Sequence, residues 1–439
     1  MPKYNNKIII MKQSKFNKRA KKIIKWTAII VVTYWLGTTL YFGYSDIDER
    51  KGTYVYYWSG LNALWRDDKE FGFKHNEIFE TKLDGADGPY IFGDTIFRVD
   101  GDNSLYVEPL DSSRIVTVEA DNADKDVFQV KLRKEYAQEA DQFQLSKKMI
   151  AISDIEGNFD GFYSFLIANG VMDMQYHWTY GAGHLVLNGD FVDRGKNTTQ
   201  VLWLIYKLEQ EAEKAGGKVH YILGNHEIMN LYGDVSYCDF KYMEAAKRIG
   251  NTTRWDKGLR RLFAAESELG RWLRSKNIAE KIGLYLFVHA GLNTRHVDEK
   301  LSFKEMNAIA RKYYGIYPDQ KLEDKRHALV LSSYFSPYWD RSLSMNFLYR
   351  AVYFFNDPSN APTHKPSQEE LEKVLHYYGG EKLVIGHSVV DAITVDYKGK
   401  VFKIDVKHGQ EKDSGKTVGL LIENGKEYAV DDKGRRSKL

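Results

Sequence analysis

Five short apolar runs, separated by longer amphipathic segments, stand out between residues 147 and 410. The runs are MIAIS (149–153), HLVLN (184–188), VHYIL (219–223), LYLFV (284–288) and KLVIG (382–386). Short apolar runs predict buried β-strands, and the segments between them have the spacing of helices. Strands that alternate with helices are typical of an α/β fold, which we predict for residues 146–410.

Every one of these predicted strands ends in polar residues. The clusters are SDIEGN (153–158), NGDFVDRG (188–195), GNHE (224–227), HAG (289–291) and GHS (386–388). A single Asp or Asn in such a place is commonly a helix cap or turn residue. Five clusters together instead indicate one site, because α/β sheets bind ligands at strand ends. Mixed oxygen and nitrogen ligands, with a carboxylate able to bridge, suit two divalent metal ions.

The order of these motifs resembles the signature of the calcineurin-like metallophosphoesterases, specifically the phosphoprotein phosphatase branch. Two blocks agree in full, Gly189-Asp190-Phe191-Val192-Asp193-Arg194-Gly195 and Gly224-Asn225-His226-Glu227. The resemblance covers about residues 147–410. It implies an αββα sandwich that hydrolyses phosphomonoesters with a dinuclear metal centre and a metal-bound hydroxide.

The resemblance also implies the ligands of two divalent ions. They are Asp154, Glu156, Asp190, Asn225, His289 and His387. Asp190 would bridge the two ions, with Asp154 on the first ion. Asn225, His289 and His387 would serve the second. Four other histidines, His177, His184, His220 and His296, are interpreted as structural.

Catalytic groups follow from the same resemblance. His226 would protonate the leaving oxygen and would be oriented by Asp193. Arg194 would bind phosphate oxygens. The block Pro337-Tyr338-Trp339-Asp340-Arg341 resembles that of bacterial members, which makes Arg341 the candidate for a second phosphate arginine. Planar guanidinium groups suit this task because they bind phosphate in a bidentate way.

Glu156 departs from the family pattern, which has a histidine at this position. A carboxylate ligand favours a harder cation. We therefore expect Mn2+, with Fe, Zn2+ or Mg2+ as alternatives. The competing interpretation is that Glu156 caps the helix that begins near Asn158, where a negative charge is favourable.

The N-terminal segment has a strong charge asymmetry. Residues 1–25 hold nine Lys and Arg and no acid, and residues 26–44 carry no charge. This pattern predicts a basic cytoplasmic arm and a transmembrane anchor, with residues 45–439 in an extracytoplasmic (periplasmic) location. A cleaved signal peptide is the alternative. Beyond the arm, 54 bases face 60 acids, which argues against nucleic-acid binding.

Short alternating runs punctuated by Gly and Asp predict a β-rich module over residues 45–145, with a helix over 124–142 that leads to the catalytic domain. Two hairpins are predicted near the C-terminus, with turns at Lys398-Gly399 and Asn424-Gly425. Residues 411–439 would comprise the second hairpin and a disordered tail.

Three functions remain open. The expected function is hydrolysis of phosphoproteins, at phosphotyrosine or at phosphoserine and phosphothreonine. The first alternative is a phosphatase of small molecules or nucleotides, such as a bis-nucleotide hydrolase. The second is a metal-binding module that recognises phosphoproteins without turnover because of Glu156. Retention of His226, Asp193 and Arg194 favours turnover, since a binding module needs no proton donor.

Overall fold

The computed structural model describes residues 19–37, 45–48, 53–57, 71–74, 77–80, 86–101, 104–252, 254–316, 322, 324–356 and 361–439. The chain folds as two compact units, residues 1–83 and residues 84–439. This division falls at residue 83, whereas the sequence predicts a boundary at residue 145.

The first unit contains a helix over residues 19–37 and a four-stranded antiparallel sheet. The strands follow the order β1 (Ser45–Asp48), β2 (Thr53–Tyr57), β3 (Phe71–Lys74) and β4 (Glu77–Glu80). Among the residues described, none of the helices is both long enough and apolar enough to span a bilayer. The anchor predicted at 26–44 is therefore not supported, and residues 38–44 of it lie outside the described residues. The extracytoplasmic location stays a prediction.

Two six-stranded sheets form the centre of the second unit. In spatial order, the first contains β13 (Lys218–Tyr221), β12 (His184–Leu187), β11 (Lys148–Ile152), β19 (Val418–Glu423), β20 (Lys426–Asp431) and β21 (Arg436–Lys438). The second contains β10 (Gln142–Phe143), β14 (Ala279–Ile282), β15 (Tyr285–Val288), β16 (Lys382–Ile385), β18 (Val401–Lys403) and β17 (Thr394–Asp396). All five predicted strands are confirmed.

Apolar side chains from both sheets share one buried core. Met149, Val186 and Leu420 contribute from the first sheet, and Phe287 and Val384 from the second. Burial of this shared apolar surface is the main force that holds the two sheets together.

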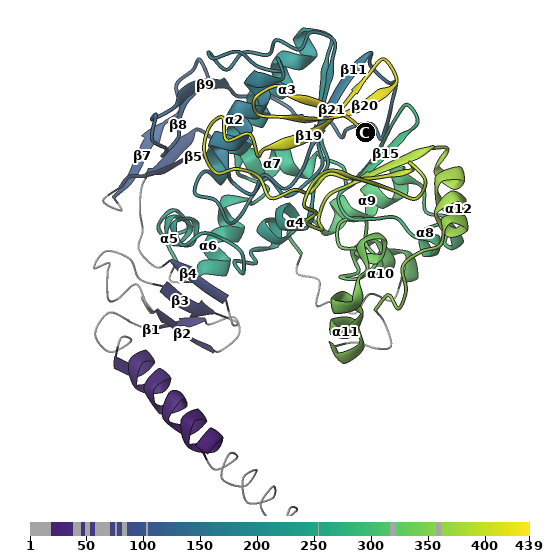
Figure 1. The fold of residues 1–439 in the computed structure, drawn as a ribbon. Helices are drawn as coiled ribbons and strands as arrows, with labels where there is room; N and C mark the ends of the chain where they lie inside the picture. Colours follow the sequence, from purple (N-terminus) through teal and green to yellow (C-terminus); the bar gives the residue numbers. More distant parts are fainter. Residues whose placement is uncertain are drawn as a thin grey trace, which may run out of the picture. The chain divides into compact units, whose positions relative to one another are not determined.

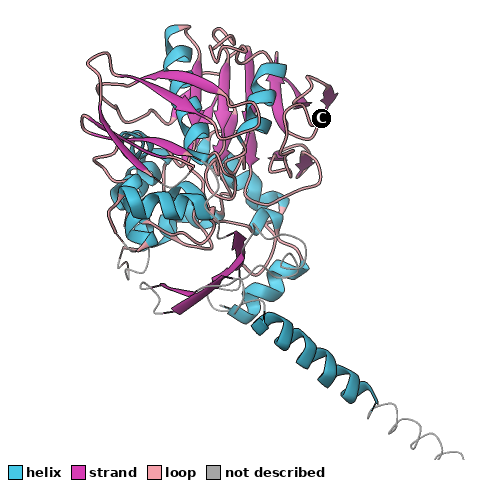
Figure 2. Ribbon diagram, turned by 90° about the vertical axis from the view of Figure 1, so that its left-hand side faces the viewer, coloured by secondary structure: helices cyan, strands magenta, loops and turns pink. Residues whose placement is uncertain are grey.

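Helices lie against both sheets, with the strands between them (Figures 1 and 2). On the first sheet, α3 (Thr198–Lys214) packs against β13 and α2 (Phe159–Ala168) packs beside α3. On the second, α9 (Phe303–Tyr313) packs against β14. The predicted mixed α/β sandwich is thus confirmed. The remaining helices are α4 (Asn225–Tyr232), α5 (Phe240–Ile249), α6 (Trp255–Leu262), α7 (Glu268–Arg274), α8 (Thr294–Asp298), α10 (Lys325–Leu331), η2 (Ser342–Ser344), α11 (Phe347–Asn356) and α12 (Gln368–Tyr378).

Five strands precede the sandwich within the second unit. They are β5 (Asp87–Phe92), β6 (Thr95–Val99), β7 (Leu105–Pro109), β8 (Ile115–Glu119) and β9 (Val127–Lys131). Hydrogen bonds tie β5 to α3: Tyr90 and Thr199 share one of 2.8 Å, and Trp203 donates to the carbonyl of Pro89 over 2.9 Å. The helix predicted over 124–142 is wrong. Phe128 and Val130 alternate with exposed residues along β9, so the strand buries one face.

Both predicted C-terminal hairpins are confirmed, but the disordered tail is wrong. Strand β21 pairs with β20, with Lys438 opposite Tyr428. Strand β19 pairs antiparallel with β11. The C-terminal hairpin therefore extends the first sheet beside β11.

Candidate active site

The polar clusters meet where strands of both sheets end, and their backbone there is unusual. Six of these residues have positive φ, a region that Asp and His tolerate better than most side chains but still at a cost. They are Asp154 (56°), Glu156 (51°), Asp190 (60°), Asp193 (71°), Arg194 (55°) and His387 (65°). Such strained backbone in loops is characteristic of functional sites.

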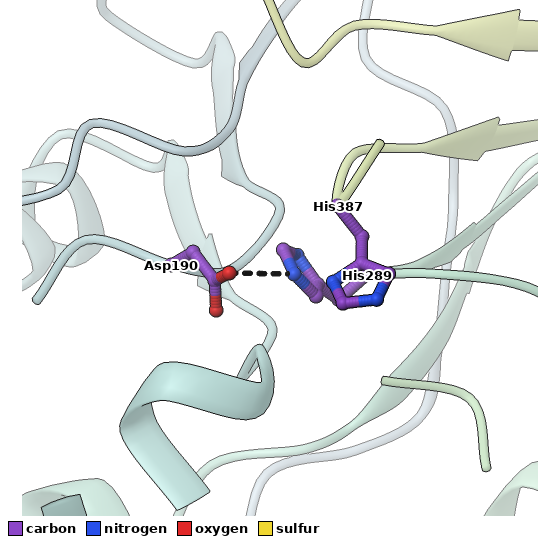
Figure 3. A group of neighbouring side chains, drawn as sticks. All are labelled: Asp190, His289 and His387. Carbon is purple, nitrogen blue, oxygen red and sulfur yellow. Dashed lines mark ion pairs between the residues drawn. The ribbon is translucent and has the colours of Figure 1, made fainter. Parts of the chain in front are cut away.

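Three of the predicted ligands converge on one point. One side-chain atom each of Asp190, His289 and His387 lies within 4.8 Å of the others, and all three residues are buried. Figure 3 shows the carboxylate facing the two imidazoles, with Nε2 of His289 at 3.0 Å from Oδ2 of Asp190. A terminal amide atom of Asn225 lies 2.8 Å from Nδ1 of His387 and 3.2 Å from Nε2 of His289. If a cation lies among these atoms, the side-chain oxygen of Asn225 must occupy this position. If no cation lies there, hydrogen bonding favours the side-chain nitrogen in the same position.

The protonation of the two imidazoles fits a divalent metal. Nδ1 of His289 donates to the carbonyl of Asn188 over 2.7 Å, which leaves Nε2 as the atom directed at the cluster. Burial opposes a charge on His289, but Asp190 and Asp154 outweigh it and raise its pKa to about 10. A divalent cation would take the place of that proton. Burial, Arg341 and His289 lower the pKa of His387, so its ring stays neutral, as ligation of a metal requires.

Glu227 fixes the loop that carries Asp190. Its carboxylate is fully buried and accepts hydrogen bonds from the backbone N–H groups of Asp190 (2.9 Å), Phe191 (2.7 Å) and Gly224 (2.7 Å), and from the Tyr221 hydroxyl (2.9 Å). Gly224 is required because a Cβ there would collide with the Asp190 carboxylate. Glu227 of the GNHE motif therefore also fixes the backbone of the neighbouring motif, which carries Asp190.

His226 and Asp193 form a buried pair beside the predicted metal ligands. Nδ1 of His226 lies 2.7 Å from Oδ2 of Asp193, and its backbone N–H donates to Oδ1 of Asp190 over 2.9 Å. Burial opposes protonation of His226, but Asp190 and Asp193 raise its pKa. The imidazole is therefore held in a fixed orientation and retains a proton that it can donate.

Two arginines border the same cluster. Arg341 donates to the carbonyl of His387 over 2.9 Å and to the hydroxyl of Ser388 over 3.3 Å. The side chain of Arg194 is 49% exposed and forms an ion pair with Glu156. The structure thus brings both predicted phosphate arginines to the cluster.

Asp154 and Glu156 lie next to the cluster without joining its three converging atoms. Oδ2 of Asp154 accepts from the backbone N–H of His387 over 3.2 Å. The capping interpretation of Glu156 is wrong, because Asn158 is the N-cap of α2 and accepts from Gly161 over 3.1 Å. Ligation by Glu156 stays a prediction.

Three residues that the sequence analysis did not assign to the site also border it. The ring of Tyr237 lies 4.8 Å from that of His226, and the thiol of Cys238 donates to Asp193 over 3.2 Å. Asp405 is buried near Asp154 and Asp190. Of these three residues, only Asp405 could have been found from the sequence, because it follows an apolar run as the predicted ligands do.

The four histidines interpreted as structural lie outside this cluster. His220 contacts Glu280 over 2.7 Å and His184 over 3.1 Å, His296 is fully buried, and His177 lies beside Asp173.

Comparison with known proteins agrees with this geometry. The model of the calcineurin-like phosphoesterase family matches residues 147–391, which is more than half of the chain. The chain belongs to this family. As a member, the phosphoesterase is a hydrolase that depends on divalent metal ions.

Its similarities lie in the protein phosphatase branch. Shewanella-like protein phosphatase 2 of Arabidopsis thaliana is 26% identical over 303 residues, which cover 60% of this chain and 72% of that protein. Shewanella-like protein phosphatase 1 of Plasmodium berghei is also 26% identical, over 59% of this chain and 66% of that protein. The crystal structure of the cold-active protein-tyrosine phosphatase of a psychrophilic Shewanella species superposes with a TM-score of 0.67 and 27% identity, covering 81% of this chain and 99% of that one.

Proposed function

We propose that this phosphoesterase removes phosphate from phosphoproteins, with phosphotyrosine as the favoured residue. The observation that carries the proposal is the Asp193–His226 pair, 2.7 Å apart, beside the cluster of Asp190, His289 and His387. A proton donor held next to metal ligands is what cleavage of a phosphomonoester with a poor leaving group requires.

The predicted ligands have different roles in metal binding. Asp190 would be shared by two ions, Asn225, His289 and His387 would hold the second ion, and Asp154 would hold the first. When bound, the ions neutralise charge on phosphate oxygens and make water a better nucleophile. Their identity is open, and we propose Mn2+.

Phosphate binding and proton transfer fall to other side chains. Arg194 and Arg341 bind the remaining phosphate oxygens because guanidinium groups keep their charge. His226, held by Asp193, protonates the leaving oxygen. The leaving group must then lie beside His226, where the Tyr237 ring is in contact with the imidazole. An aromatic leaving group packs well against such a ring.

The names of similar proteins support the choice of substrate. Two relatives are named protein phosphatases, and the similar Shewanella structure is named a protein-tyrosine phosphatase. A small-molecule or nucleotide phosphatase and a binding module without turnover remain the competing functions.

Phosphate release by the purified full chain, loaded with Mn2+, tests the proposal. Phosphotyrosine and phosphoserine peptides of one sequence and a dinucleoside tetraphosphate would be compared, with His226→Asn as the inactive control. We expect kcat/KM to be highest for the phosphotyrosine peptide. Faster hydrolysis of the dinucleotide would establish the nucleotide alternative, and metal binding without release from any substrate would establish the binding module.

A further inference from the structure

Asp405 lies at the end of a strand that runs beside the strand of His387. Strand β18 is parallel to β16, with Ile385 opposite Lys403. The pairing continues past the strand, because the Ile404 N–H donates to the carbonyl of Ile385 over 2.8 Å. Beyond Ile404, the carbonyl of Asp405 accepts from the Val390 N–H over 2.8 Å, so Asp405 follows the loop that leads from His387 to Val390. The residue therefore occupies a strand end equivalent to those of the other ligands.

The chain after Asp405 packs onto the loop of the first motif. Nε2 of His408 contacts the carbonyl of Ser153 over 2.8 Å, and Ser153 directly precedes Asp154. Asp154 and Asp405 also contact the same loop: Oδ2 of Asp154 accepts from the His387 N–H over 3.2 Å, and the carbonyl of Asp405 accepts from the Val390 N–H over 2.8 Å. The two carboxylates are thus near neighbours across the two sheets.

The carboxylate of Asp405 is buried and has no protein partner among the described residues. The residue is 4% exposed, and no hydrogen bond or ion pair to its side chain is present in that part of the chain. Asp87, also 4% exposed, shows the usual arrangement: it accepts from Tyr90 over 2.6 Å and from Thr199 over 3.4 Å. An unpaired buried carboxylate is costly unless a cation compensates it.

Glu156 stands where the family has a histidine ligand, but its side chain contacts Arg194. Its carboxylate forms an ion pair with Arg194 and is 26% exposed. The first metal position would therefore lack one ligand if only Asp154 and Asp190 served it.

We propose that Asp405 is a ligand of the first metal ion, together with Asp154 and Asp190, and that Glu156 instead partners Arg194. Three carboxylates select a hard divalent cation that prefers oxygen, such as Mn2+ or Mg2+. Asp405, from the second sheet, thus replaces the histidine ligand that the family has at position 156. This inference rests on the proposed two-metal centre.

Metal content and affinity test the assignment without an activity assay. The full chain would be stripped of metal and titrated with Mn2+ by calorimetry, and bound metal would be counted by elemental analysis. Wild type should bind two ions. Asp405→Asn should keep one tight site, with the other weakened roughly 10- to 100-fold. Glu156→Gln and the matched control Asp87→Asn should keep both.

A melting experiment guards against misfolding. Without metal, Asp405→Asn should raise Tm or leave it unchanged, because it removes a carboxyl group whose ionisation is disfavoured by burial. With Mn2+ it should gain less in Tm than wild type, because it binds one ion less tightly.

Other outcomes would overturn the assignment. Wild-type stoichiometry and affinity in Asp405→Asn would remove Asp405 from the site, as would loss of one ion in Glu156→Gln alone. Both results leave the proposed phosphatase intact. Failure of wild type to bind any metal would instead refute the metal centre itself.

Discussion

The thiol of Cys238 donates a hydrogen bond to Oδ1 of Asp193 over 3.2 Å, on the carboxylate whose other oxygen holds His226. Asn230 donates to the same Oδ1 over 2.8 Å. Donors of this kind fix the carboxylate in position, and with it the imidazole that it orients. Cys238, the single cysteine of the chain, thus helps to hold the proton donor His226 in place through Asp193.

Substitution of Cys238 tests this support. Cys238→Ser keeps a donor and should retain activity within about threefold. Cys238→Ala removes one hydrogen bond of about 1 kcal/mol, so kcat on an alkyl phosphate should fall roughly fivefold. The pH profile of kcat should shift in the Ala variant only. An unchanged profile in both variants would restrict Cys238 to packing.

Removal of the proton donor should depend on the leaving group. His226→Asn should lower turnover of an alkyl phosphate by roughly 100- to 10,000-fold. The loss should be much smaller on a nitrophenyl ester, whose leaving group departs without a proton. Steady-state rates on both esters decide the point. Equal losses would show that the substitution disturbs metal positioning instead.

The ion pair between Glu156 and Arg194 predicts a gain of affinity when the acid is neutralised. In Glu156→Gln the guanidinium no longer has a competing carboxylate, so inorganic phosphate should inhibit roughly three- to tenfold more strongly. Arg194→Lys should weaken inhibition, because an ammonium cannot bind phosphate in a bidentate way. Competitive inhibition constants measure both effects. Weaker inhibition in Glu156→Gln would favour its role as a metal ligand.

Acid should destabilise the fold through His296. Burial lowers the pKa of this side chain to about 3, whereas an unfolded histidine titrates near about pH 6.5. As the pH falls from about 6 to 4, the unfolded chain takes up a proton that the folded protein refuses. The free energy of unfolding should therefore fall by up to about 1.4 kcal/mol per pH unit from this residue.

Urea titrations at several pH values measure that slope. His296→Asn should flatten it. His177→Asn replaces a side chain that is 60% exposed and should leave the slope unchanged. If both variants retain the wild-type slope, the acid sensitivity arises elsewhere in the chain.

The predicted part of the site rests on local sequence. Asp190, Asp193 and Arg194 follow one apolar run within five positions, and His226 stands in a short motif after another. Each strand end is encoded by its own residues, and parallel strands bring those ends to one edge. The order of strands in the sheets was not needed to find these residues.

Contacts between distant segments could not be predicted in this way. The neighbourhood of Asp405 and Asp154 depends on how β18 lies beside β16, and that of Cys238 and Asp193 depends on the loop between α4 and α5. The tail near Arg436, which the sequence predicts to be disordered, pairs instead with the edge of β20. Tertiary pairing here outweighs local composition.

The candidate ligands come from both sheets: Asp190 follows β12 of the first, and His289 and His387 follow β15 and β16 of the second. An ion held by all three would join the sheets as a removable cross-link at one end of their shared core. Removal of the ion by a chelator should then loosen the packing between the two sheets before the helices unfold. Amide hydrogen exchange should report it as faster exchange at the ends of β12 and β15, with little change in α3. In this protein, a bound ion would thus hold the two sheets together as well as take part in the chemistry.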